Sequence, residues 1–216
     1  ERRPTSVETK LERSVLERLP PALRDINDRL ARVFTAAGHE LYLVGGVVRD
    51  LLLGRPVTDL DYTTSAHPDE TKRLGQEAGA DSIYTVGEAF GTIGLVFAGV
   101  TVEITTYRTE WYPTPDRRPT VRFGESLLED LARRDFTVNA MAVHAVTGDL
   151  VDPYGGLRDL ERRLIRAVGD PRERFREDPL RILRAARFAA QLGFDIEAET
   201  RAAMRELAAE LQRVSV

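Results

Sequence analysis

Two spacings of apolar residues alternate along this chain of 216 residues and outline its secondary structure. Apolar positions three or four residues apart predict amphipathic helices at 22–37, 68–78 and 126–134. Short runs of β-branched and aromatic residues, most of them bounded by glycine or proline, predict strands at 42–44, 58–63, 82–86, 92–97, 100–105, 143–146 and 150–151. Ala98-Gly99 fits a hairpin turn between antiparallel strands. The pattern therefore predicts a fold that combines helices with antiparallel strands.

The C-terminal part of the chain has a different pattern. The run Asp152-Pro153-Tyr154-Gly155-Gly156 interrupts the strands, and almost everything from Leu157 onward has helical spacing. Such a shift is typical of a domain boundary. We therefore expect N-terminal helices at 1–37, a sheet-containing domain at 38–152 and an all-α segment at 153–216.

The stretch at 43–61 combines a glycine turn with two carboxylates. Gly45 and Gly46 connect a strand to a helix, where free backbone N–H groups suit a phosphate, and Arg49 adds a permanently charged fork. Asp59 and Asp61 occupy alternate positions of the next predicted strand, so both carboxylates face the same side. Oxygen ligands beside phosphates suit magnesium. Either motif alone also fits an ordinary surface turn, but together they predict a metal and phosphate site.

Two later segments extend this hypothesis. Glu103 lies on the polar face of the strand at 100–105 and is a candidate third carboxylate, although an outward glutamate is usually only solvated. The segment 108–122 holds three prolines, a tryptophan and several arginines, which predicts a long loop. Such a loop could act as a lid over a nucleotide or have no function.

A second unusual set occurs at the start of a predicted helix. Asp178, Arg181, Arg184 and Arg187 recur every three residues and form one ridge on the helix surface. This spacing fits an ion pair followed by a solvated arginine stripe. It also fits a rigid set of groups that hydrogen-bond the edge of a base.

Composition narrows the class of protein. The chain has 42% hydrophobic and 31% charged residues, no cysteine and three histidines, which leaves little material for disulfides, thiolate metal sites or zinc clusters. No apolar run is long enough to cross a bilayer, so we expect no membrane partner, and the absence of cysteine fits a cytoplasmic protein. The net charge is −4, but arginines are dense at 158–187, which keeps a nucleic-acid partner open.

Four segments together resemble one family, the class II tRNA nucleotidyltransferases or CCA-adding enzymes, with bacterial poly(A) polymerases as near relatives. Motif A of that family is similar to Gly45-Gly46-x-x-Arg49-Asp50 through Asp59-x-Asp61, and motif B is similar to Arg133-Arg134-Asp135-Phe136-Thr137-x-Asn139. Motif C is similar to Asp152-Pro153-x-Gly155-Gly156, and motif D is similar to Glu177-Asp178-x-x-Arg181-x-x-Arg184. The resemblance implies an α+β fold, with a DNA polymerase β-like nucleotidyltransferase head at 38–152 and an all-α neck at 153–216. The head would contain a mixed, mostly antiparallel sheet with helices. By this resemblance, family members continue into body and tail domains, which we expect to lie outside residues 1–216.

The resemblance also implies roles for individual residues. Asp59 and Asp61 would bind two Mg²⁺ ions, with Glu103 as the third acidic partner. The triphosphate would lie against Gly45, Gly46 and Arg49. Asp135 would bind the ribose hydroxyls, and Asp178 and Arg181 would select the base of CTP or ATP. Further nucleotide contacts are implied for Arg134, Asn139, Arg184 and Arg187.

The implied reaction is template-independent transfer of CMP and AMP from CTP and ATP to the 3′ end of tRNA. An enzyme that adds only the terminal A shares all of these motifs. A poly(A) polymerase and a non-catalytic nucleotide- or RNA-binding fragment are further alternatives. The sequence does not predict the oligomeric state.

Overall fold

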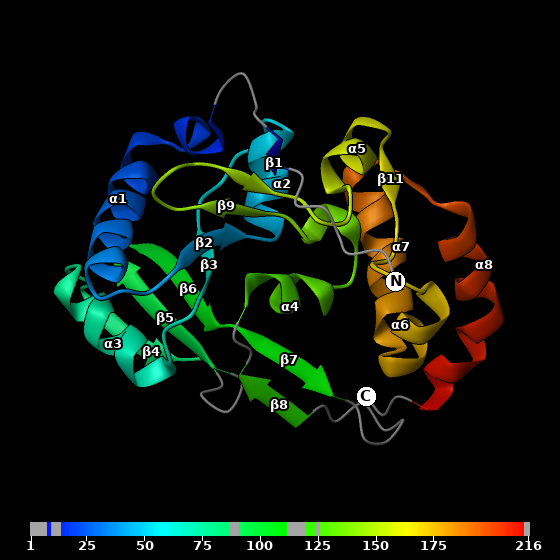
Figure 1. Cartoon of the computed structure of the whole chain (residues 1–216). Helices are drawn as coiled ribbons and strands as arrows, with labels where there is room; N and C mark the ends of the chain where they lie inside the picture. Colours follow the sequence, from blue (N-terminus) through cyan, green and yellow to red (C-terminus); the bar gives the residue numbers. More distant parts are fainter. Residues whose placement is uncertain (1–7, 10–13, 87–90, 112–119, 124–125, 214–216) are drawn as a thin grey trace.

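The computed structural model describes residues 8–9, 14–86, 91–111, 120–123 and 126–213 (Figure 1). The helices within these ranges are η1 (Val15–Arg18), α1 (Pro21–Ala36), α2 (Gly46–Leu52), α3 (Pro68–Glu77), α4 (Leu127–Ala132), η3 (Thr137–Asn139), α5 (Gly156–Glu161), α6 (Pro171–Glu177), α7 (Leu180–Leu192), α8 (Ala198–Leu207) and η4 (Ala208–Arg213). The strands are β1 (Glu8–Thr9), β2 (Leu41–Val44), β3 (Leu60–Thr64), β4 (Ser82–Thr85), β5 (Thr92–Phe97), β6 (Val100–Thr106), β7 (Arg108–Trp111), β8 (Thr120–Phe123), β9 (Ala142–His144), β10 (Leu150–Val151), β11 (Leu164–Ile165) and β12 (Asp195–Ile196).

Within the described ranges, eight strands form the central sheet in the order β1-β10-β9-β2-β3-β6-β5-β4. Neighbouring strands are antiparallel except β3 and β6, which run parallel. The β5–β6 hairpin turns at Ala98 (φ 48°) and Gly99 (φ 82°), the two positive angles of a type I′ turn. The predicted α+β fold and its mostly antiparallel sheet are confirmed.

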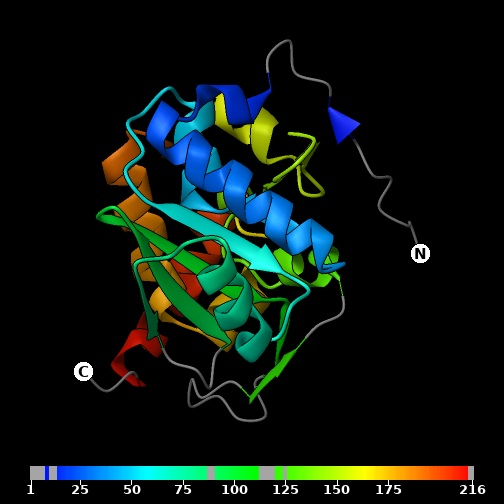
Figure 2. The ribbon, with the colours of Figure 1, turned by 90° about the vertical axis from the view of Figure 1, so that its left-hand side faces the viewer.

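One face of the sheet is buried under α1 and α3 (Figure 2). Side chains alternate along each strand, so Leu60 and Tyr62 of β3 point into this core while Asp61 between them points to the opposite face. On α3, a Cβ at Gly75 would come within 2.6 Å of the Leu95 side chain on β5, so this glycine lets helix and sheet pack closely. The buried face therefore determines which side chains of β3, β5 and β6 remain for a site.

A buried hydrogen-bond chain ties α1 to the strand that carries Asp61. The hydroxyl of Tyr62 donates to Asn27 Oδ1 at 2.8 Å, and Asn27 Nδ2 donates to the carbonyl oxygen of Ala145 at 3.0 Å. Asn27 is completely buried and Tyr62 is 1% exposed. Since a buried polar group without a partner costs stability, each of these residues depends on the other.

The segment after residue 153 is mostly helical, and it also contains a two-stranded parallel sheet of β11 and β12. It is therefore not all-α. Asp152 accepts hydrogen bonds from the N–H groups of Gly156 and Leu157, which starts α5. A Cβ at Gly156 would lie 2.3 Å from the carbonyl oxygen of Thr137, so α5 packs directly on the backbone of η3. The division into domains at residues 37 and 152 stays a prediction.

Two local predictions were wrong. The predicted strand at 58–63 begins only at Leu60, whose register partner is Val102, and Asp59 precedes it in a bend. The predicted loop at 108–122 instead contributes the antiparallel strands β7 and β8. Its three prolines lie at positions 113, 115 and 119, in the part outside the described residues, and leave both strands free of proline.

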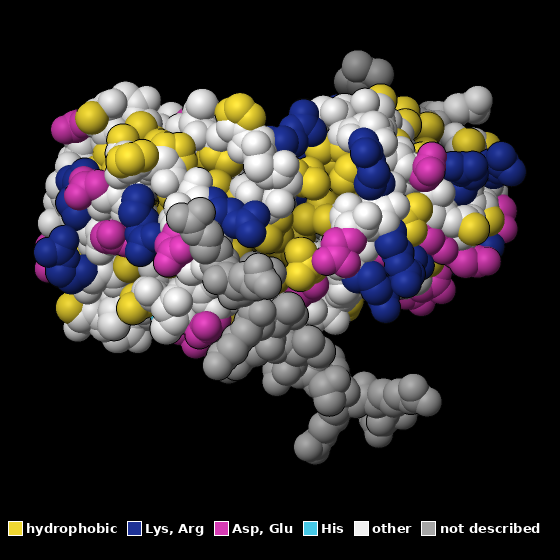
Figure 3. Space-filling model, turned by 90° about the horizontal axis from the view of Figure 1, so that it is seen from above, with side chains coloured by type: hydrophobic (Ala, Val, Ile, Leu, Met, Phe, Trp, Pro, Cys, Tyr) yellow, Lys and Arg dark blue, Asp and Glu magenta, His cyan; other side chains and the backbone are white. Residues whose placement is uncertain are grey.

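The dense arginines at 158–187 do not form an open basic stripe. Arg166 pairs with Asp159 and Glu197, and Arg172 pairs with Glu199 and Glu206. In the view from above (Figure 3), Asp and Glu side chains lie beside many of the Lys and Arg side chains. Among the described residues, no helix has both the length and the apolar character needed to span a membrane.

The Asn27–Tyr62 contact predicts coupled effects on stability. Asn27→Ala removes the acceptor and leaves the Tyr62 hydroxyl buried without a partner, so we expect the free energy of unfolding to fall by about 1–3 kcal/mol. In a Tyr62→Phe background the same substitution should cost less, because no hydroxyl is left unpaired. Urea unfolding of the two single variants and the double variant measures this coupling, and strictly additive effects would contradict it.

Candidate active site

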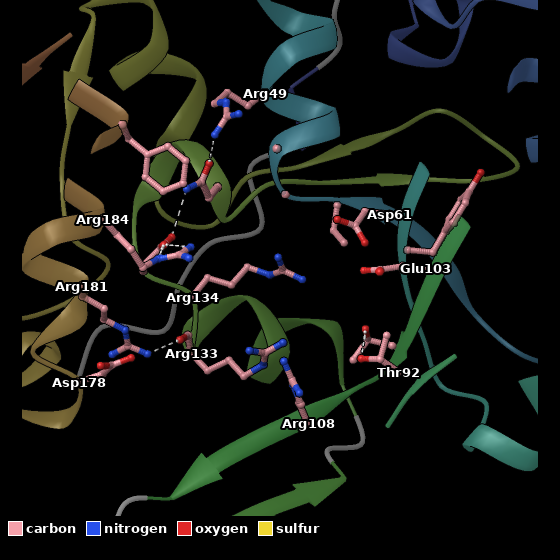
Figure 4. Close-up of a pocket in the computed structure, with 18 residues that line it drawn as sticks. Arg49, Asp61, Thr92, Glu103, Arg108, Arg133, Arg134, Asp178, Arg181 and Arg184 are labelled. Carbon is pink, nitrogen blue, oxygen red and sulfur yellow. Dashed lines mark hydrogen bonds and ion pairs between the residues drawn. The ribbon is translucent and has the colours of Figure 1, made fainter. Parts of the chain in front are cut away.

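A cavity of about 730 Å³ lies between the open face of the sheet and the helices α4 and α7 (Figure 4). This volume is in the range of pockets that hold small molecules. The lining residues come from strands, helices and the segments that join them: Val44, Gly45, Gly46, Arg49, Asp61, Tyr62, Thr92, Glu103, Thr105, Arg108, Arg133, Arg134, Asp135, Asn139, Asp178, Arg181, Arg184 and Phe188. Most of the residues that the sequence predicted for the site are therefore brought together.

The acidic side of the pocket comes from the parallel strands β3 and β6. Asp61 and Glu103 are register partners, and their carboxylates point toward one another (Figure 4). The carboxyl of Asp61 keeps contact with solvent, but the pocket walls desolvate it, and its pKa rises to about 6. Repulsion from Glu103 adds to this rise, whereas the Arg134 guanidinium lowers the pKa. Two crowded carboxylates of this kind fit a bound cation.

Asp59 is placed differently from the other two predicted acids. It is exposed, lies in the bend before β3 and is not among the residues that line the pocket. Its charge still contributes to the raised pKa of Asp61. Within the described ranges, no three His, Asp or Glu side chains lie close enough together to hold a metal ion. The structure therefore brings together two of the three predicted acids.

The glycine turn brings two arginines close to the backbone. Gly45 has φ 70° and precedes the first turn of α2, which starts at Gly46. A Cβ at Gly45 would lie 3.2 Å from Arg134 Nη1, and a Cβ at Gly46 would lie 3.2 Å from Arg49 Nη2. The missing side chains thus allow both guanidinium groups to flank the turn, an arrangement that suits a polyanion.

A chain of polar contacts runs from α2 to α7 through the segment between α4 and β9. Arg49 Nη1 donates to Asn139 Oδ1 at 2.8 Å, and Asn139 Nδ2 donates to Asp135 Oδ1 at 3.2 Å. Asp135 Oδ1 also accepts the N–H of Phe136, while Asp135 Oδ2 accepts Arg184 Nε at 2.9 Å and Arg184 Nη2. Asp135 is only 8% exposed. Its two oxygens thus already accept four hydrogen bonds, close to the capacity of a carboxylate.

The junction of α6 and α7 forms the side of the pocket opposite Asp61 and Glu103 (Figure 4). Asp178 Oδ1 accepts the N–H of Leu180 at 3.1 Å. Arg181 is 6% exposed, and its guanidinium donates to Glu177 and to the carbonyl oxygens of Arg174 and Arg133. These contacts hold both predicted base-reading groups in one orientation.

The ridge of arginines on α7 does not act as one set. Arg184 reaches the pocket, with its side chain 45% exposed. Arg187 is exposed and outside the pocket lining, and its guanidinium lies 5.1 Å from the ring centroid of Phe188. Three residues are less than one full turn of an α-helix, so each member of the ridge points in a slightly different direction from the one before it. The fourth member, Arg187, therefore no longer faces the pocket.

Several pocket residues were not predicted from the sequence as site residues. The hydroxyl groups of Thr92 and Thr105 form a hydrogen bond of 2.9 Å. The side chains of Arg108 and Arg133 point toward one another (Figure 4). Thr105 shares the polar face of its strand with Glu103, so alternation could have indicated it. Arg108 lies at the start of β7, in the segment predicted to be a loop. Asp130 was also missed; it is completely buried on α4 and pairs with Arg133 and Arg134.

The charges around Asp61 predict that two substitutions shift its pKa in opposite directions. In the metal-free chain, kept in EDTA, we expect a carboxyl pKa of about 6. Glu103→Gln removes a like charge and should lower this pKa, whereas Arg134→Gln removes a stabilising cation and should raise it. NMR titration of the ¹³C-labelled carboxyl group measures both changes. A pKa near 4 in the unsubstituted chain, or shifts of the same sign, would contradict the described geometry.

Comparisons with known proteins show which family this chain is similar to. Residues 41–166 match the poly A polymerase head domain. The CCA-adding enzyme of Streptococcus gordonii is 46% identical over 202 residues, which cover 93% of this chain and 49% of that protein. The structure of the Bacillus stearothermophilus CCA-adding enzyme in complex with CTP is similar at a TM-score of 0.79 and 39% identity, over 91% of this chain and 46% of that one. The Thermotoga maritima CCA-adding enzyme complexed with tRNA gives a TM-score of 0.82 at 29% identity, over 98% and 48% of the two chains.

The chain spans about half the length of these relatives. The match to the head domain covers more than half of the chain and includes motifs A, B and C. The family resemblance predicted from the four motifs is therefore confirmed: the chain belongs to the poly A polymerase head domain family, which includes the tRNA nucleotidyltransferases of the CCA-adding type.

Proposed function

We propose that this chain is the catalytic and nucleotide-selecting part of a tRNA nucleotidyltransferase. It transfers CMP and AMP from CTP and ATP to the 3′ end of tRNA without a nucleic-acid template. One observation carries the proposal: a single pocket joins the Asp61–Glu103 carboxylates, the arginine-flanked glycine turn and the Asp178–Arg181 junction. Relatives of the same family bind CTP and tRNA in their solved structures.

The acidic side of the pocket fits divalent cations. The raised pKa of Asp61 reflects first its desolvation by the pocket walls and then repulsion from the Glu103 carboxylate, and a bound cation would relieve that repulsion. We assign Asp61 and Glu103 to this site, with Asp59 two residues away as the further acidic partner, and Mg²⁺ as the metal in two positions. When bound, such ions lower the pKa of the RNA 3′ hydroxyl and stabilise the leaving pyrophosphate.

The glycine turn and its two arginines bind the triphosphate. The backbone at Gly45 and Gly46 carries no side chain, so phosphate oxygens can approach it closely. Arg49 is held by Asn139 and Asp50, and Arg134 by Asp130, so both guanidinium groups are fixed before a nucleotide arrives. Preorganised charge of this kind stabilises the negative charge that develops when the 3′ oxygen displaces pyrophosphate from the α-phosphorus.

The opposite side of the pocket selects the nucleotide. Asp178 and Arg181 present an acceptor and a donor from a rigid junction, and such a pair can hydrogen-bond the edge of cytosine or adenine without a template. Asp135 accepts the ribose hydroxyls. Because its oxygens already accept four hydrogen bonds, the half-exposed Arg184 must release at least one of them when the ribose binds.

Nucleotide addition by the chain itself tests the proposal. A short RNA hairpin that mimics the acceptor stem and ends before CCA should gain C, C and A in order when CTP, ATP and Mg²⁺ are present. Asp61→Asn should reduce incorporation by at least about 100-fold, since even outer partners of a metal site contribute 10- to 100-fold. Binding of CTP, measured by calorimetry, should change little, because the triphosphate and base contacts remain.

The products also separate the alternatives. Addition of A only to a hairpin ending in CC would identify an A-adding enzyme, and long tails from ATP alone would identify a poly(A) polymerase. Nucleotide binding without any incorporation would support a non-catalytic module and overturn the proposal.

The role of Asp135 predicts a change in sugar preference. Asp135→Asn loses the charged acceptor for the ribose hydroxyls, so the preference for CTP over dCTP in kcat/KM should fall by about 10-fold or more. Arg187→Gln is the matched control from α7, because its side chain lies outside the pocket, and it should leave the preference unchanged. An equal loss in both variants, or none in either, would exclude this role for Asp135.

A further inference from the structure

One row of residues crosses the sheet at the level of the acidic pair. Tyr84 on β4 is the register partner of Gly94 on β5, Gly94 is the partner of Glu103 on β6, and Glu103 is the partner of Asp61 on β3. Side chains directly opposite one another in a sheet lie on the same face. The ring of Tyr84 therefore shares the open face of the sheet with the two carboxylates.

Gly94 gives this ring its position. A Cβ on Gly94 would lie 2.2 Å from Cζ of Tyr84, so the ring lies directly over the glycine. Adjacent strands are about 4.8 Å apart, which places the ring roughly one strand spacing from the backbone of Glu103. Tyr84 is 39% exposed, one of the few large hydrophobic residues at the surface of the described part of the chain. The sheet thus presents an open aromatic face beside its acidic pair.

The ring lies on the far side of the carboxylates from the glycine turn. The strands run in the order β2-β3-β6-β5-β4, and the turn at Gly45 and Gly46 follows β2, whereas Tyr84 is on β4 at the edge of the sheet. In phosphoryl transfer the attacking and leaving oxygens lie roughly in line with the phosphorus. If the leaving pyrophosphate lies at the glycine turn, the attacking RNA end must approach from the side of β6, β5 and β4.

We infer that Tyr84 is the stacking platform for the base of the 3′-terminal nucleotide of the acceptor RNA. This inference rests on the proposed function and adds a second substrate subsite to it. The last base of the acceptor RNA changes during the reaction, from the base before CCA to the first C and then to the second C. A subsite for this base must therefore accept different bases, and an aromatic face does so. The Thr92–Thr105 hydroxyl pair lies two residues along the same face from Gly94 and Glu103, and offers polar contacts to the sugar of that nucleotide. The open edge at β4 lets the RNA strand enter without crossing the nucleotide pocket.

A purely structural role for Tyr84 is the alternative that the experiment must exclude. An aromatic residue opposite a glycine in a sheet covers the exposed backbone and stabilises the pair. Leucine can provide such a cover but cannot stack on a base, whereas phenylalanine can do both. Tyr84→Leu, Tyr84→Phe and the exposed same-strand control Ser82→Ala therefore separate the two roles.

The experiment measures KM for an RNA hairpin ending in CC and KM for ATP, with the whole chain. Stacking on an aromatic residue contributes about 1–3 kcal/mol per base, so Tyr84→Leu should raise KM for the hairpin about 5- to 150-fold and leave KM for ATP unchanged. Tyr84→Phe and Ser82→Ala should match the unsubstituted chain. A hairpin with 2-aminopurine as its last base gives a second readout, because stacking quenches its fluorescence: Tyr84→Phe should keep the quenching and Tyr84→Leu should lose it.

Two outcomes would overturn the inference. If Tyr84→Leu leaves KM for the hairpin and the quenching unchanged, the RNA end does not stack on Tyr84, although nucleotide addition would still stand. If the variants change KM for the hairpin and for ATP equally, Tyr84 only supports the sheet. Failure of the unsubstituted chain to add any nucleotide would instead refute the proposed function, and the fluorescence measurement would still test the RNA contact by itself.

Discussion

The parallel pairing of β3 with β6 holds two carboxylates side by side, and the rest of the site depends on this unfavourable contact. The raised pKa of Asp61 reflects first its desolvation in the pocket and then repulsion from Glu103, which together are the cost of this contact. The burial of Leu60, Val102 and Ile104 on the other face of the same strands opposes it. Because one register aligns both faces, the strands cannot slip to separate the acids without exposing core residues. Packing thus stores the repulsion that a bound cation would relieve.

The nucleotide side of the pocket depends on a different kind of link. Asp135 accepts hydrogen bonds from Asn139, which holds Arg49, and from Arg184 on α7, so one buried carboxylate connects the proposed triphosphate site with the helix proposed to read the base. A charged network at low exposure is stable only while every member has a partner. Replacing a member should therefore alter both triphosphate contacts and base contacts, even where the member touches neither.

Much of the fold could be predicted because local periodicity decides it. The alternation that places Leu60 and Tyr62 in the core also places Asp61 on the open face, so strand, core and candidate ligand follow from one pattern. The Ala98-Gly99 turn follows from the few residues that tolerate positive φ. The position of Asp59 could not be predicted in this way, because alternation does not say at which residue a strand begins. The two strands in the segment 108–122 were not predicted, because the segment as a whole is rich in proline. All three of its prolines lie between the strands in the sequence.

The contacts that complete the site join residues far apart in the sequence, and no periodic pattern predicts them. Arg184 and Asp135 are 49 residues apart, and Arg181 reaches the carbonyl oxygen of Arg133 over 48 residues. Both contacts require α7 to lie against the segment that follows α4. That placement depends on Gly156, where a side chain would collide with the backbone of Thr137, and on the buried hydrogen bond from Thr137 to Asp159. The glycine of motif C is thus explained by packing. It brings α7, the helix proposed to read the base, within reach of the acidic strands, so a change at Gly156 should affect which nucleotide is chosen without touching the nucleotide.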